Sequence, residues 1–275
     1  MDQFNPISEI RPSILATDLD GTLIPLDGNA ANQADLKTLD DWLSEHDCSL
    51  IFVTGRPFPS VQSVMQSAAL PIPQWILCDV GTSIYQAQSG NHYQPVVAYS
   101  QHLDTIVADA PRAIVEEALR QHQSIELQSA DNQRPHKISY QCDVRNMEAA
   151  MDALIADLKN NFPAWQAMAS VDPFDGRGLI DILPAGASKA HGILWLAEYA
   201  QLDPSAIVYA GDSGNDLAAL TAGFRAIVVS NADESVKTAV TQALAARKLT
   251  HRLHLAKNPA TSGVLEGLKV FSDKS

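Results

Sequence analysis

The stretch that decides the fold reads Ile14-Leu15-Ala16-Thr17-Asp18-Leu19-Asp20-Gly21-Thr22. Its apolar first part predicts a short buried strand, and two carboxylates follow at the carboxyl end of that strand. Strand side chains alternate with a period of two residues, so we expect Asp18 and Asp20 to point the same way. Two neighbouring carboxylates repel each other, which indicates a hard divalent cation as their partner, most simply Mg²⁺. Gly21 allows the backbone to leave the strand sharply.

This pair of carboxylates has two interpretations. In the functional one, Asp18 is a nucleophile and Asp20 moves a proton. In the simpler one, the residues form a Ca²⁺-like turn or a solvated loop after a strand. The rest of the chain has to distinguish them.

The composition is that of an ordinary globular protein. The chain has 275 residues, of which 46% are hydrophobic and 19% are charged, and this length suits a large domain with a smaller insertion. The 19 Lys and Arg against 32 Asp and Glu give a net charge of −13, which disfavours nucleic acid and anionic membranes as partners. The sequence shows neither a membrane-spanning run nor a signal-peptide pattern, so we expect a cytoplasmic protein. The oligomeric state stays open.

Short apolar runs alternate with amphipathic helical patterns in the first and last thirds of the chain. Strands are predicted at residues 14–18, 49–54, 75–78, 206–210 and 225–229. Helices are predicted at residues 34–45, from Pro57 onward, and at about 215–222. Strands that are apolar on both faces and separated by helices predict an α/β fold, a Rossmann-like, doubly wound parallel sheet.

The middle of the chain has a different pattern. Strand-like segments are predicted at residues 95–99, 136–140 and 178–182, with longer helical patterns at 111–121 and 146–159. This order indicates an inserted α+β domain. We therefore predict a core of residues 1–86 and 184–275 and an inserted domain of residues 87–183.

Two further segments suit an anion site. Thr54-Gly55-Arg56-Pro57 ends the second predicted strand, where a hydroxyl and the amides of a helix start converge, although many such turns look alike. Later, Ser188 is a natural N-cap that places Lys189 in the first turn of a helix. A lysine there opposes the helix dipole, which makes sense if an anion lies close by. A solvated surface lysine is the open alternative.

A second acidic turn, Gly211-Asp212-Ser213-Gly214-Asn215-Asp216, follows the predicted strand at 206–210. Asp212 and Asp216 would complete an oxygen shell for the same metal as the first pair. The alternative is a capped loop, because Asp and Asn are common before helices. Two acidic turns at strand ends favour the site, since ligands of such sheets bind outside the carboxyl ends of the strands.

In this order the four segments resemble the four motifs of the haloacid dehalogenase (HAD) superfamily of phosphohydrolases. The resemblance runs from about Ile14 to Leu268, and the insertion resembles a type IIB cap. Within the superfamily the chain is most similar to sucrose-phosphate phosphatases and related sugar phosphatases. The segments that carry this finer likeness are residues 79–85, 137–140 and 181–184.

The resemblance implies a Mg²⁺-dependent hydrolase of a sugar phosphate that acts through an aspartyl-phosphate. It implies catalytic roles for four residues: Asp18 as nucleophile, Asp20 as acid and base, Thr54 and Lys189. The implied metal ligands are Asp18, the backbone carbonyl of Asp20, Asp212 and Asp216. The implied substrate contacts are Gly55, Arg56, Asn215 and, from the cap, Lys137, which is otherwise a solvated lysine.

Two other functions stay open at this point. A phosphomutase of the same capped type would need a phosphorylated cofactor to reload the aspartate. A non-catalytic protein that binds sugar phosphates would not need Asp20 as a proton carrier. The identity of the sugar phosphate is also open, and sucrose 6-phosphate is one candidate.

Overall fold

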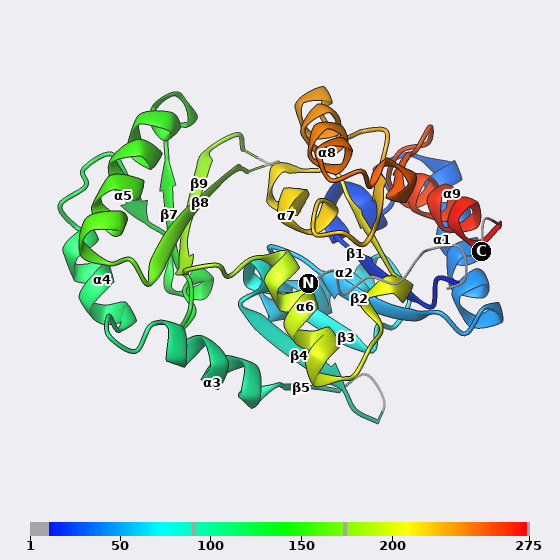
Figure 1. Cartoon of the computed structure of the whole chain (residues 1–275), viewed down its shortest axis with the longest axis horizontal. Coiled ribbons are helices and arrows are strands. Elements are labelled where there is room, and N and C mark those ends of the chain that lie inside the picture. Colours follow the sequence, from blue (N-terminus) through cyan, green and yellow to red (C-terminus); the bar gives the residue numbers. More distant parts are fainter. Residues whose placement is uncertain (1–10, 90–91, 173–174, 274–275) are drawn as a thin grey trace. The chain divides into compact units, whose positions relative to one another are not determined.

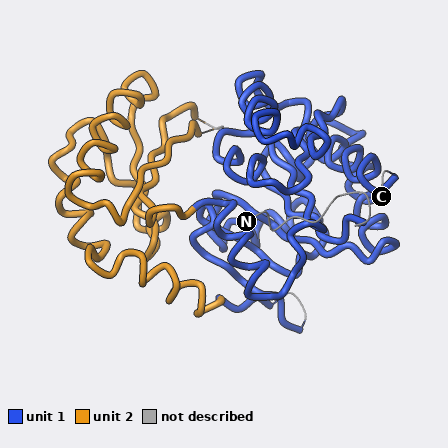
Figure 2. Tube along the Cα trace, in the orientation of Figure 1, with its two compact units in different colours: residues 1–95, 188–275 blue, residues 96–187 orange. Residues whose placement is uncertain are grey.

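A computed structural model describes residues 11–89, 92–172 and 175–273 (Figure 1). The N-terminal segment in which no signal-peptide pattern was found lies outside these residues. The chain forms two compact units (Figure 2), residues 1–95 with 188–275 and residues 96–187, here called the core unit and the inserted unit. The domain boundaries predicted from the sequence, at 87 and 183, stay a prediction. No helix in the described part of the chain is long and apolar enough to cross a membrane.

The core unit contains an eight-stranded sheet in the order β12-β11-β10-β1-β2-β3-β4-β5. The strands are β1 (Ile14–Thr17), β2 (Ser49–Val53), β3 (Trp75–Cys78), β4 (Ser83–Ala87), β5 (Tyr93–Pro95), β10 (Ile207–Gly211), β11 (Arg225–Val228) and β12 (Leu253–Leu255). The six strands from β12 to β3 are parallel, and β4 and β5 add antiparallel pairs at one edge. The predicted doubly wound parallel core is confirmed, whereas the antiparallel edge was not predicted.

Helices cover both faces of this sheet. They are α1 (Ala30–Glu45), α2 (Phe58–Ser67), α6 (Lys189–Tyr199), α7 (Leu217–Leu220), α8 (Glu234–Ala246) and α9 (Ala260–Asp273). One buried cluster joins Leu39 of α1 and Leu268 of α9 to Ile76 and Val208 of the sheet. On the other face, a Cβ added to Gly192 of α6 would lie 3.0 Å from Leu77 of β3. Because strand side chains alternate, consecutive residues along β3, or along β10, face opposite helix layers.

The inserted unit is an α+β arrangement around an antiparallel sheet with the order β6-β7-β9-β8. Its strands are β6 (Glu126–Leu127), β7 (Ile138–Cys142), β8 (Trp165–Val171) and β9 (Gly178–Pro184), and its helices are α3 (Val97–Ile106), α4 (Arg112–Leu119) and α5 (Met147–Asn161). Leu119 of α4 and Leu154 of α5 pack with Ile138 and Ile180 of the sheet. The predicted α+β insertion is confirmed.

The strand predicted at residues 95–99 is wrong. Strand β5 ends at Pro95, and α3 begins at Val97. Tyr99 and Leu103 are both buried and lie four residues apart, which is the spacing of one helix face. A run of β-branched and aromatic residues had hidden this period, because short apolar runs fit a strand and a buried helix equally well.

Candidate active site

The first acidic turn begins where β1 ends. The strand stops at Thr17, so Asp18 and Asp20 lie in the turn that follows and not on the strand itself. The backbone N–H of Asp18 donates to Ala210 of β10 at 2.9 Å, which extends the pairing of the two strands by one residue. This pairing brings the first acidic turn beside the second, which starts at Gly211.

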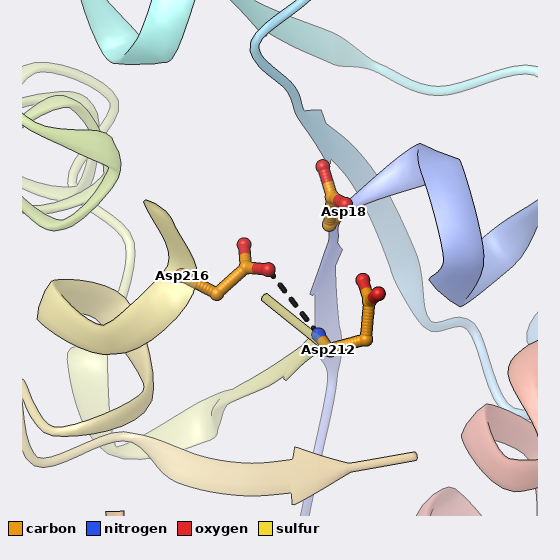
Figure 3. Close-up of side chains that lie close together, drawn as sticks. All are labelled: Asp18, Asp212 and Asp216. Atoms are coloured by element: carbon orange, nitrogen blue, oxygen red, sulfur yellow. Dashed lines mark hydrogen bonds between the residues drawn. The ribbon is translucent and has the colours of Figure 1, made fainter. Parts of the chain in front are cut away.

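Three carboxylates meet at this end of the sheet. Figure 3 shows the side chains of Asp18, Asp212 and Asp216 gathered around the end of β1. One oxygen from each of the three lies within 4.8 Å of the others. Strand β1 lies between β10 and β2, where the chain order reverses, and this is the position at which open α/β sheets bind ligands.

Lys189 lies between two of these carboxylates. Its Nζ donates to Asp18 Oδ1 at 2.8 Å and to Asp216 Oδ1 at 2.7 Å, and its side chain is fully buried. Ser188 caps α6 as predicted, accepting from the backbone of His191 at 3.2 Å. Burial opposes the charge on Lys189, but the two carboxylates outweigh it and raise the pKa of the ammonium group. Lys189 is therefore a buried cation, not a solvated surface lysine.

Asp216 accepts more hydrogen bonds than any other carboxylate of the site. Its Oδ2 accepts from the backbone N–H of Asp212 at 3.2 Å and from the N–H and Oγ of Ser213, both at 3.0 Å. Its Oδ1 accepts from Lys189 Nζ and from Tyr209 Oη, the latter at 2.5 Å. A carboxylate offers about four lone-pair positions, so these five donors saturate it.

Asp212 is held by the first acidic turn. Thr22 Oγ1 donates to Asp212 Oδ1 at 2.7 Å. Gly21 has a left-handed backbone, with φ 73°, and a Cβ built on it would lie 2.5 Å from Asp212 Oδ2. A residue with a side chain would therefore push this carboxylate away, and glycine is required by the contact as well as by the backbone.

The charges of the cluster fit a divalent cation. Burial, with the charges of Asp216 and Asp212 adding to it, raises the pKa of Asp18 well above its usual range. Burial and the charge of Asp216 raise the pKa of Asp212 to about 6. When all three carboxylates are ionised, the one ammonium group leaves two negative charges uncompensated, and a bound cation would favour this ionised state. A hard ion such as Mg²⁺, which prefers oxygen ligands, suits both the charge and the donor atoms.

Asp20 is paired with Arg56. Arg56 Nε donates to Asp20 Oδ2 at 2.7 Å, and Nη2 donates to Asp20 Oδ1 at 2.6 Å. Arg56 Nη1 donates to Ser60 of α2 at 2.8 Å, which fixes the plane of the guanidinium. The hydrogen bonds from Arg56 to Asp20 raise the pKa of Arg56. The structure therefore joins a predicted proton carrier to a predicted substrate ligand.

The remaining predicted residues of the core unit lie at the same edge of the sheet. Thr54 is buried directly after β2, and its Oγ1 accepts from the backbone N–H of Arg56 at 3.1 Å. A Cβ on Gly55 would lie 3.8 Å from Asn215 Nδ2, so these two turns are neighbours. Asn215 Oδ1 lies 3.1 Å from Ser213 Oγ, the hydroxyl that also lies 3.0 Å from Asp216 Oδ2.

Lys137 belongs to the inserted unit. Its side chain is buried, and its Nζ lies 3.8 Å from Asp181 Oδ1. The same oxygen accepts from Ser139 Oγ at 2.6 Å. Lys137 is therefore not the solvated lysine that the sequence left open, and its contact with a sugar stays a prediction.

Sequence reasoning missed Tyr209 and the partner of Thr22. Tyr209 was included in a predicted apolar strand, and no contact between Thr22 and the second acidic turn was predicted. The one available signal was a side-chain hydroxyl inside an apolar strand that leads directly into an acidic turn.

Comparisons with known proteins agree on the kind of protein that this chain is similar to. A family model described as sucrose-6F-phosphate phosphohydrolase matches residues 11–272. A HAD-like hydrolase of Nitrosococcus oceani is 32% identical over 94% of this chain and 71% of its own length. The mannosylfructose-phosphate phosphatase of Agrobacterium fabrum is 26% identical over 93% of this chain and 95% of its own length.

One solved structure and the plant relatives complete the comparison. The sucrose-phosphatase of Synechocystis sp. PCC6803, solved in complex with sucrose and phosphate, superposes with a TM-score of 0.78 at 23% identity, covering 95% of this chain and 98% of that chain. The chain spans about half the length of the plant sucrose-phosphatases that it matches, 53% for sucrose-phosphatase 2 of Nicotiana tabacum, which is 26% identical over 86% of this chain.

Proposed function

This chain belongs to the sucrose-6F-phosphate phosphohydrolase family, and on that premise we propose that it is a Mg²⁺-dependent phosphatase of a disaccharide or glycoside phosphate. The observation that carries the proposal is the buried contact of Lys189 Nζ with Asp18 Oδ1, 2.8 Å long, beside two further carboxylates. The names of the relatives support the substrate class, because sucrose phosphate and mannosylfructose phosphate are both phosphorylated disaccharides. Phosphate release from a panel of sugar phosphates identifies which of these, or which similar glycoside phosphate, is the substrate.

In the proposed reaction Asp18 attacks phosphorus in line and forms an aspartyl-phosphate. Lys189 holds Asp18 Oδ1, which leaves Oδ2 to act as the attacking atom. As Asp18 gives up its charge to the new P–O bond, the ammonium of Lys189 is available to the phosphoryl oxygens. Thr54 and the backbone at Gly55 complete the set of donors around the phosphate group.

The metal ligands in this proposal are Asp18, Asp212 and the backbone carbonyl of Asp20. When bound there, Mg²⁺ supplies positive charge that neutralises the phosphoryl oxygens and the two uncompensated carboxylates. Asp216 is also within reach of such a site, but the five donors on its oxygens favour a supporting role. We propose that it orients Lys189 and the backbone of the second acidic turn.

Asp20 acts in this scheme as the general acid for the leaving sugar oxygen and then as the base for the attacking water. Both of its oxygens face Arg56 in this structure. We propose that the guanidinium transfers from Asp20 to the phosphate group of the arriving substrate, since Arg binds carboxylates and phosphates with the same two-pronged geometry. Asp20 is then released to reach the leaving group.

The test is phosphate release from a panel of sugar monophosphates, with sucrose 6-phosphate, simple hexose phosphates and p-nitrophenyl phosphate included. Each is measured with Mg²⁺, with EDTA, and with the Asp18→Asn variant, whose side chain keeps its size but cannot form the intermediate. We expect Mg²⁺-dependent release without any bisphosphate activator, and no turnover by Asp18→Asn at native thermal stability. Dependence on a bisphosphate would instead indicate a phosphomutase. Binding without release would indicate a non-catalytic protein.

A further inference from the structure

Tyr209 is a fully buried tyrosine in the middle of β10. Its neighbours Val208 and Ala210 point into the buried cluster shared with α1 and α9, so Tyr209 points to the opposite face of the sheet. There its hydroxyl donates to Asp216 Oδ1 at 2.5 Å. Tyr209 is thus a residue of β10 whose side chain contacts the charged cluster directly.

The presence of a buried hydroxyl at position 209 requires an explanation. Burying a hydroxyl away from water costs free energy unless it is hydrogen-bonded, and phenylalanine would fill the same volume in an apolar strand at no such cost. The bond to Asp216 compensates this cost. Burial and the charges of Asp216 and Asp18 raise the pKa of Tyr209 well above its usual range, so the hydroxyl keeps its proton and stays a donor.

Asp216 Oδ1 accepts hydrogen bonds from two donors, Lys189 Nζ and Tyr209 Oη. The strength of the second bond affects how strongly Asp216 attracts Lys189. Lys189 Nζ lies 2.7 Å from this oxygen and 2.8 Å from Asp18 Oδ1, so the ammonium is shared between two carboxylates. A hydrogen bond from Tyr209 satisfies part of the charge on Asp216 Oδ1 and weakens its attraction for the lysine. Without that hydrogen bond, the ammonium would be drawn toward Asp216 and away from Asp18.

We propose that Tyr209 is a positioning residue, which keeps Lys189 shared between Asp216 and the nucleophile by donating to Asp216. The inference rests on the proposed function, because the position of Lys189 matters to the rate only if Asp18 attacks a phosphate ester. The hydrogen bond of Tyr209 goes to Asp216, so its effect on Asp18 passes through Asp216 and Lys189 in turn. Its effect is therefore expected on the chemical step and not on substrate binding.

The test compares Tyr209→Phe with a matched control, Tyr93→Phe. Tyr93 also lies in the core sheet, and its hydroxyl donates to the backbone carbonyl of Pro73 at 2.9 Å, away from the charged cluster. With Mg²⁺ and p-nitrophenyl phosphate, we expect Tyr209→Phe to lower kcat about tenfold, the effect of one hydrogen bond to a charged group, and to leave KM within about twofold. Tyr93→Phe should keep the native kcat.

A second measurement does not depend on activity. In crystal structures of the metal-free variants, we expect Lys189 Nζ to move out of hydrogen-bond range of Asp18 Oδ1 in Tyr209→Phe and to stay in place in Tyr93→Phe. An unchanged kcat, or an unchanged Lys189, overturns the proposal while the phosphatase function stands. If the native protein releases no phosphate from any ester, the proposed function fails. The position of Lys189 in the two variants then decides the positioning role alone.

Discussion

The close approach of Gly21 to Asp212 gives a sharp test of the site. A Cβ built on Gly21, where φ is 73°, would lie 2.5 Å from Asp212 Oδ2. Gly28 has a similar backbone, with φ 71°, but a Cβ there would meet no atom within 4 Å. Changing each glycine to alanine therefore applies similar backbone strain with and without a collision at the proposed metal site.

The expected magnitudes follow from these contacts. Alanine in a left-handed conformation costs about 1 kcal/mol relative to glycine, so both variants should lose about that much free energy of unfolding. In Gly21→Ala the carboxylate of Asp212 must also move by about 0.9 Å to reach the 3.4 Å of ordinary contact. The hydrogen bond from Thr22, 2.7 Å long, resists this movement. A misplacement of about 1 Å in an active site costs about 100-fold in rate.

The assay is phosphate release across a series of Mg²⁺ concentrations, with urea unfolding of both variants in parallel. We expect Gly28→Ala to keep kcat/KM within about twofold of the native value. Gly21→Ala should lose about 100-fold and require more Mg²⁺ for half-maximal rate. Equal activity of the two variants at equal stability would refute the placement of Asp212 in the site.

Three further outcomes are expected. Arg56→Lys replaces a two-pronged contact by a single charge, so KM for the sugar phosphate should rise about tenfold in steady-state assays, and an unchanged KM would contradict the proposed transfer of Arg56 from Asp20 to substrate. Without metal, the folded state binds more protons than the unfolded state between pH 4 and the Asp212 pKa of about 6. The free energy of unfolding, measured in urea with EDTA, should therefore fall by up to about 3 kcal/mol as the pH rises through this range. Added Mg²⁺ should restore it. Asn32→Ala removes a buried amide that ties α1 to the start of α9 through contacts of 2.8 and 3.1 Å, so we expect a loss of about 2 kcal/mol in urea unfolding with kcat unchanged, and a changed kcat would show that this tie reaches the site.

The sequence predicted the fold because each signal was local and repeated. Apolar runs ending in Asp18, Thr54 and Gly211 are buried parallel strands in the structure, and carboxyl ends of parallel strands meet at one edge. The superfamily resemblance and the phosphatase class predicted from these motifs are confirmed by the family match over residues 11–272. The error at residues 95–99 arose where a short apolar run had no second signal to set its period.

The contacts within the site could not be predicted in the same way. Motif order places Asp20 and Arg56 near each other, but whether they pair depends on the side-chain directions in two turns. The role proposed for Tyr209 depends on the register of β10 against β1, in which Tyr209 lies opposite Ala16 and so shares the face on which Asp18 follows. The register is a property of two strands that are far apart in sequence, so it cannot be predicted from the residues of either strand alone.

The excess of carboxylates accounts for a site that combines a buried lysine with the proposed Mg²⁺ ion. Lys189 alone neutralises one of the three charges of Asp18, Asp212 and Asp216, and its two hydrogen bonds go to the first and the last. Among the residues that the structure describes, Asp212 forms no ion pair; Thr22 Oγ1 donates to its side chain at 2.7 Å, and its pKa is raised to about 6. In the proposed mechanism Lys189 and Asp216 therefore form the pair that orients Asp18, and Asp212 is the carboxylate available to bind the ion. The contrast between Asp212 and the fully hydrogen-bonded Asp216 therefore supports the proposed Mg²⁺ site.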